Sequence, residues 1–186
     1  MTRMYATLMP LCLLLAACGD DPSNYSAPVG INLKVKGDVP KTTIDDGKNV
    51  TTESGNPYGA FVQAARAKLG RDPARITLDR VTLTLGATST GVTALEQVFA
   101  GDATVAFLMN DTNNTFPAGV IPAPTGTGPV AGTATFDSVN GVAATDWTKL
   151  LGGNFQVVLS GATAAAFQVK GPEADLQVTL TFSAFP

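Results

Sequence analysis

The 186-residue chain contains no histidine. Histidine is the side chain whose ordinary pKa lies closest to neutral pH. Its absence removes the usual general acid–base residue, every Ser–His or Cys–His nucleophile pair and the commonest zinc ligand. Neither a Gly-x-Ser-x-Gly nor a Ser-x-x-Lys motif occurs, and residues 126–129 lack the spacing and the lysine of a phosphate-binding loop. These absences predict a protein that is not an enzyme and that uses no cofactor.

Acidic side chains leave one catalytic alternative open. Paired carboxylates hydrolyse glycosidic bonds without histidine, and the candidates here are Glu53, Glu96, Glu173 and scattered aspartates. Such a pair would have to converge in a concave pocket, with the pKa of one carboxyl raised. Acidic residues on a domain of this kind ordinarily form a solvated surface, so the glycosidase-like enzyme stands as the alternative.

Charge is sparse, at 15% of residues with a net charge of −3, and no basic cluster occurs. This composition predicts no nucleic-acid partner and little attraction to anionic lipid surfaces. The oxygen-rich segments at residues 45–49 and 110–114 are the candidates for calcium binding, but neither has the spacing of an EF-hand loop. We interpret both as plain turns and predict no metal site.

The amino-terminal residues carry the most specific pattern in the chain. Arg3 supplies a positive start, and an apolar stretch from Leu8 to Leu15 is interrupted only by Pro10. Small residues then lead into Cys18, which is the architecture of a secretory signal. The stretch is shorter than the roughly 20 apolar residues that a membrane-spanning helix needs.

The segment Leu15-Ala16-Ala17-Cys18 resembles the lipobox of bacterial lipoproteins. The resemblance implies cleavage before Cys18 and a diacylglycerol on its thiol, which would hold the protein on a membrane of the cell envelope. The residue after Cys18 is Gly19 rather than Asp, which favours the outer membrane over the inner membrane. Residues 1–17 are therefore predicted to be a signal peptide, residues 18–29 a flexible membrane tether and residues 30–186 a single domain.

Cysteine usage follows from the same resemblance. The chain has two cysteines, of which Cys12 would leave with the signal peptide and Cys18 would be acylated. No thiol would remain for a disulfide, so the hydrophobic core must stabilise the domain.

Within the domain, hydrophobic periodicity predicts many strands and a single helix. Asn56 and Pro57 are typical of a helix start, and an apolar stripe at spacings of three and four continues to Gly70. The alternation slips in phase at residues 79–80, which predicts a β-bulge or a strand that bends between two sheets. A long polar loop is expected over residues 37–56 and a helical turn over 93–100. Strands are expected over residues 31–36, 75–85, 103–109, 130–136, 155–159, 167–169 and 175–184.

This pattern predicts a mainly β fold, an antiparallel β-sandwich of immunoglobulin-like architecture with about seven strands and one inserted helix. The Cys…Trp…Cys framework of immunoglobulin domains is missing.

A long segment from residue 110 to residue 129 is the candidate partner-binding loop, because long loops in compact domains are often functional. Its apolar side chains are Phe116, Val120 and Ile121. The predicted function is a membrane-anchored envelope protein whose domain is structural or binds another envelope protein. The remaining alternative, a carrier of a small ligand or lipid, would require an apolar cavity of several hundred Å³.

Overall fold

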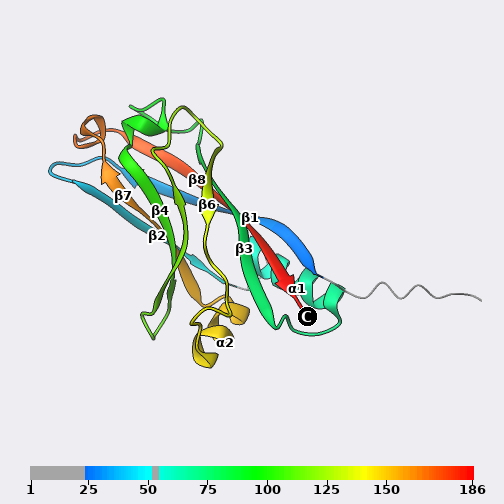
Figure 1. The fold of residues 1–186 in the computed structure, drawn as a ribbon. Coiled ribbons are helices and arrows are strands. Elements are labelled where there is room, and N and C mark those ends of the chain that lie inside the picture. The colour runs from blue at the N-terminus through cyan, green and yellow to red at the C-terminus, as the bar shows by residue number, and fades with distance from the viewer. Residues whose placement is uncertain (1–23, 52–54) are drawn as a thin grey trace, which may run out of the picture.

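All eight strands that the computed structural model describes belong to one antiparallel sheet, in the order β1-β8-β3-β6-β5-β4-β7-β2 (Figure 1). The structure describes residues 24–51 and 55–186. The strands are β1 Tyr25–Lys36, β2 Thr43–Val50, β3 Arg75–Leu85, β4 Phe99–Met109, β5 Thr115–Ile121, β6 Val130–Ala134, β7 Phe155–Thr163 and β8 Glu173–Phe185. The helices are α1 Pro57–Leu69, α2 Ala144–Gly152, and the 3-10 turns η1 Leu95–Gln97 and η2 Ala165–Phe167.

Strict alternation along β8 builds one wall of the core. Leu176, Val178, Leu180, Phe182 and Ala184 are fully buried, as the sequence predicts. The residues between them face outward or are half-buried, except Ser183, whose hydroxyl donates a hydrogen bond to Asp79. The sheet curls around this apolar face, and aromatic rings from α1, β4, β7 and β8 meet at its centre.

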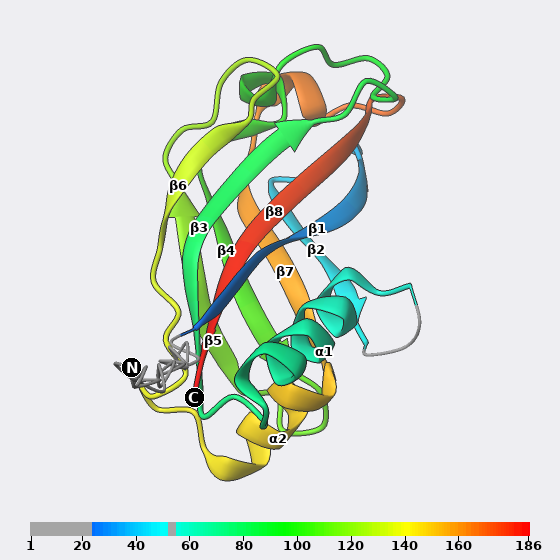
Figure 2. The same ribbon diagram turned by 90° about the vertical axis from the view of Figure 1, so that its right-hand side faces the viewer.

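Helix α1 begins and ends as its sequence predicts. The side chain of Asn56 accepts a hydrogen bond from the backbone N–H of Tyr58 at 3.0 Å, and Gly70 ends the helix with φ at 69°. Its apolar stripe, which includes Phe61 and Leu69, is buried beside β1. The helix lies at one end of the molecule, close to α2 and to the C-terminus (Figure 2).

The predicted bulge in β3 is confirmed. Asp79 is an extra residue between Leu78, which pairs with Phe182, and Arg80, which pairs with Thr181. Beyond the bulge, β3 pairs with the short strand β6 over three residues, and β6 pairs with β5 over two. This narrow connection through β6 joins the two halves of the sheet.

Several elements differ from the sequence predictions, and for the strands the reason is that pairing outweighs weak local signals. Strand β1 begins at Tyr25, so residues 25–29 are not tether; they pair with β8. Strand β2 lies within the predicted polar loop over residues 37–56, where its pairing with β7 orders charged residues. Residues 167–169 are not a strand, since η2 ends at Phe167. Helix α2 was not predicted, because it has only nine residues and no side chain caps its start.

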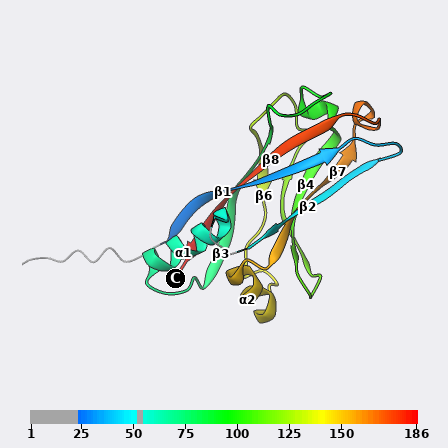
Figure 3. The ribbon, with the colours of Figure 1, turned by 180° about the vertical axis from the view of Figure 1, so that it is seen from behind.

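The fold is therefore mainly β and antiparallel, as predicted, but it has eight strands rather than about seven. An immunoglobulin-like sandwich is not confirmed, because the strands form a single sheet. The sheet curls until its end strands β1 and β2 run near each other (Figure 3). Among the described residues, these two strands are not paired.

Candidate functional site

The groove between the end strands β1 and β2 is the candidate functional site. Two neighbouring hollows follow this seam, with volumes of about 420 and 260 Å³, and both are open to solvent. Residues of β1 and β2 line both hollows, and the start of α1 closes one end of the second. The lining residues that carry polar side chains are Asn32, Lys34, Asp46, Lys48, Asn49 and Asn56.

Alternation explains why the groove is polar. In β1 the side chains of Ile31, Leu33 and Val35 enter the core, which turns Asn32 and Lys34 outward. In β2 only Ile44 and Val50 are buried, so nearly all of its other side chains are exposed. Each strand is hydrogen-bonded on one side only, to β8 or to β7, so the other edge of its backbone borders the groove.

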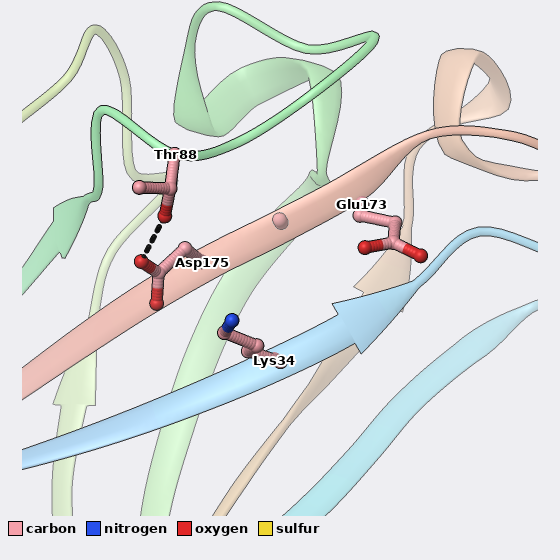
Figure 4. A pocket seen from close by; sticks show the side chains of 5 residues that line it. Lys34, Thr88, Glu173 and Asp175 are labelled. Carbon is pink, nitrogen blue, oxygen red and sulfur yellow. Dashed lines mark hydrogen bonds between the residues drawn. The ribbon is translucent and has the colours of Figure 1, made fainter.

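A small polar pocket adjoins the groove where β1 meets β8, and Lys34 lines both (Figure 4). The register places Lys34 opposite Asp175 and Lys36 opposite Glu173. Opposite charges on facing residues of neighbouring strands stabilise the pairing modestly. Lys36 Nζ lies 2.8 Å from Glu173 Oε1, and both side chains are largely exposed.

The loop after β3 covers this pocket. The hydroxyl of Thr88 donates a hydrogen bond to the Asp175 carboxylate (Figure 4). The backbone N–H groups of Thr90 and Glu173 each donate to the other's carbonyl at 2.8 Å. The loop therefore holds the Asp175 side chain and the backbone of Glu173 in place. The volume of the pocket, about 20 Å³, is that of a single water site.

The electrostatics of the pocket differ from those of a carboxylate enzyme. Hydrogen bonding to Lys36, with its positive charge, lowers the pKa of Glu173, and Glu173 in turn raises the pKa of Lys36. A general acid would need the pKa of its carboxyl raised. Among the described carboxyl groups with a resolved shift, the pKa is lowered in every case. These shifts therefore give no support to glycosidase-like chemistry at the carboxyl groups concerned.

Glu96, the other described glutamate among the predicted carboxylates, has a different role. Glu96 accepts a hydrogen bond from the backbone N–H of Gly126 at 2.7 Å, which holds the loop before β6. Glu53 lies outside the described residues, as does Cys18. No helix within residues 24–51 and 55–186 is long and apolar enough to cross a membrane.

Strand β5 lies within the predicted partner-binding loop and contains all three of its apolar candidates. Ile121 is fully buried, Phe116 is half-buried against the core, and Val120 is 37% exposed. The three side chains therefore do not form one exposed surface. The prediction of a loop was wrong, because Pro117 and the small residues beside it are untypical of a strand. The segment nevertheless pairs with β4 through a register shift.

The two calcium candidates have other roles. Residues 45–49 belong to β2. In residues 110–114, Thr112 and Asn114 donate hydrogen bonds at 2.7 and 2.8 Å to the buried carboxylate of Asp146 on α2. No group of three or more acidic or cysteine side chains in the described chain is placed to hold a metal ion.

The groove itself was missed by the sequence predictions. Its polar lining follows from the alternation in residues 31–36, but identifying an edge strand requires the pairing order of the whole sheet. The charged residues of β2 resemble a loop because exposed edge strands commonly carry charge and glycine.

Comparison with known proteins gives no family. No protein-family model and no curated protein matches the chain. Chains from three solved virus structures align over most of their length. A chain from Maize Chlorotic Mottle Virus has a TM-score of 0.31 and 10% identity, over 88% of this chain and 94% of that chain. For a chain from Turnip Yellow Mosaic Virus the TM-score is 0.29 and the identity 12%, over 100% of this chain and 89% of that chain. For a chain from Desmodium Yellow Mottle Tymovirus the TM-score is 0.25 and the identity 11%, over 100% of this chain and 93% of that chain. Scores this low carry no argument about function.

Proposed function

We propose that this protein is a lipid-anchored, non-enzymatic binding domain of the bacterial cell envelope, and that the groove between β1 and β2 holds its partner. The supporting observation is the pair of unpaired strand edges that border one open groove. Backbone N–H and C=O groups along such edges can hydrogen-bond an added strand, so the groove fits an extended polypeptide segment of another envelope protein.

The other two functions have weaker support. The described acidic pocket is water-sized, and the pKa of Glu173 is shifted in the wrong direction for a general acid. A ligand carrier would need an apolar interior cavity, but aromatic rings occupy the centre of this sheet. The anchor is supported by the resemblance of residues 15–18 to a lipobox, and Gly19 favours the outer membrane.

Two measurements test this proposal. Replacing Cys18 with Ser is expected to move the protein from the membrane pellet into the soluble envelope fraction, because the acyl chains supply the anchoring free energy. A Cys18→Ser variant that still pellets after a high-salt wash would show that the anchor is not at this residue.

The groove is tested in the anchored protein with a photo-crosslinking amino acid at Asn32. The matched control carries the same group at Thr104, an exposed position of the central strand β4. We expect a protein adduct in cells from position 32 and none from position 104. Equal yields from both positions, or no adduct from position 32, would contradict binding in the groove.

A further inference from the structure

The start of β1, which is the described segment nearest in sequence to Cys18, lies at the end of the molecule that carries both helices. Tyr25 starts β1 there, and its ring lies 5.9 Å from the ring of Phe61 on α1. The hydroxyl of Tyr58 on α1 donates a hydrogen bond at 3.0 Å to the carbonyl of Leu150 on α2. Helices α1 and α2 therefore share this end with the first described strand (Figure 2).

The loop at residues 137–143 belongs to the same end. Arg75 at the start of β3 donates a hydrogen bond to Asp137 at 3.0 Å, and Arg75 is paired in register with Phe185 near the C-terminus. The loop then leads directly into α2, so the loop and α2 form one continuous tip.

Apolar side chains are exposed on this tip. Val139 is 63% exposed, the largest exposed fraction among the large hydrophobic residues of the described chain. Val142, Trp147 and Leu151 are half-buried, with one part of each side chain packed on the core. A half-buried tryptophan and an exposed valine in one segment are typical of surfaces that meet the boundary between lipid headgroups and acyl chains.

Chain length places this tip close to the proposed anchor. Tyr25 lies seven positions after Cys18, and seven extended residues span no more than about 25 Å. Strand β1 has 12 residues, so its far end lies about 36 Å from Tyr25 when the strand is straight. The tether can hold the helical end against a membrane more readily than the far end.

We propose that the tip, defined as residues 137–143 with α2, rests on the bilayer that holds the acyl chains of Cys18, with Val139 and Trp147 in the headgroup boundary. This inference rests on the proposed anchor and adds the orientation of the domain. The charged pocket around Lys34 and Glu173 then faces away from the membrane, where a partner has access to the groove beside it.

The single tryptophan of the chain makes this contact directly measurable. The full lipidated protein is reconstituted into phosphatidylcholine vesicles with brominated or ordinary acyl chains, and the emission of Trp147 is compared. We expect brominated chains to reduce the emission about twofold and the emission maximum to shift to the blue, as for tryptophan at a membrane boundary. Unlipidated Cys18→Ser protein, mixed with the same vesicles, is expected to show neither change, because the anchor supplies the local concentration.

Two matched variants separate contact at the tip from anchoring alone. Val139→Asp in the lipidated protein is expected to abolish most of the quenching. Val169→Asp, at an exposed valine of the opposite end, is expected to leave it unchanged. Lipidated protein that floats with the vesicles but shows no quenching would overturn the tip contact and leave the anchor intact. Protein that carries no acyl chain would overturn the anchor and the orientation together.

Discussion

At the scale of single residues, Asp146 illustrates how this chain stabilises a buried charge. Its carboxylate is buried in the first turn of α2, and it accepts hydrogen bonds from Thr112 and Asn114 of the turn between β4 and β5. The hydrogen bonds from Asn114 and then Thr112 lower the pKa of Asp146, and the charge of Lys149 contributes in the same direction. The contact attaches α2 to the sheet.

Asp146→Asn is expected to destabilise the fold at pH 7 by about 1–3 kcal/mol, because the amide presents a donor where the neighbours already donate. Folding lowers the pKa of Asp146, so its charged carboxylate stabilises the folded state. This contribution to the free energy of unfolding is present above the unfolded pKa of about 3.9 and is lost as pH falls through the lower folded pKa. Urea unfolding at pH 7 and pH 3 should show a smaller difference between wild type and variant at the lower pH. Asp111→Asn is the control, because its side chain is 82% exposed. A variant as stable as wild type at pH 7 would contradict this role.

At the scale of elements, strand β6 is the narrow part of the sheet. The backbone of β5 lies so close to Gly132 that no side chain fits there. A Cβ at this position would lie 2.4 Å from the carbonyl oxygen of Val120 on β5. Gly119 of β5 is similarly close to Thr133 of β6. The two strands can approach only because each presents a glycine to the other.

Gly132→Ala is therefore expected to lower the free energy of unfolding by about 1–3 kcal/mol, since the backbone must shift to accept the methyl group. Gly101→Ala on β4 is the matched control, because a Cβ there meets nothing within 4 Å. Thermal unfolding of both variants checks this prediction. Equal melting temperatures for the two would show that β6 is not tightly constrained.

The same elements show what the sequence could predict. The alternation in β8 and the capped stripe of α1 are strong local patterns, and the structure confirms both. The phase slip at Asp79 also identified a bulge correctly. Strands β2 and β5 were missed because their order comes from pairing with β7 and β4, which no local pattern reports. The candidate groove was missed for the same reason, since an edge is a property of the whole sheet.

At the scale of the whole molecule, Tyr58 joins three parts of the fold. Its ring contacts Phe155 of β7 and Phe182 of β8 edge-on, at 5.0 and 5.3 Å between ring centres, and its hydroxyl reaches the Leu150 carbonyl on α2. Burial raises the pKa of Tyr58 strongly. Helix α1 is thereby connected to both halves of the sheet and to the proposed membrane-facing tip.

Tyr58→Phe is expected to cost about 1 kcal/mol at neutral pH, the net value of one hydrogen bond. Because folding raises the pKa of Tyr58, the neutral hydroxyl contributes fully to the free energy of unfolding below the unfolded pKa of about 10. This contribution declines as pH rises above that value. Wild type should therefore lose more stability than the variant between pH 9 and pH 11 in denaturant titrations. Tyr25→Phe, at a half-exposed ring, is the control and should leave the alkaline loss unchanged. A wild type and a Tyr58→Phe variant with the same alkaline loss would rule out this linkage.

The pairing of the end strands determines when the domain can finish folding. Strand β1 pairs only with β8 in this sheet, and β2 pairs only with β7. The first two described strands therefore cannot pair until the last two are present. Contacts between residues so distant in sequence form slowly, because a large loop must close before they are made. In a chain that emerges from a translocation channel with its amino end first, β1 and β2 stay without partners until residues 155–185 have also emerged. Under the proposed export, the sheet is therefore completed late, and during that interval β1 and β2 lack the strands with which they pair.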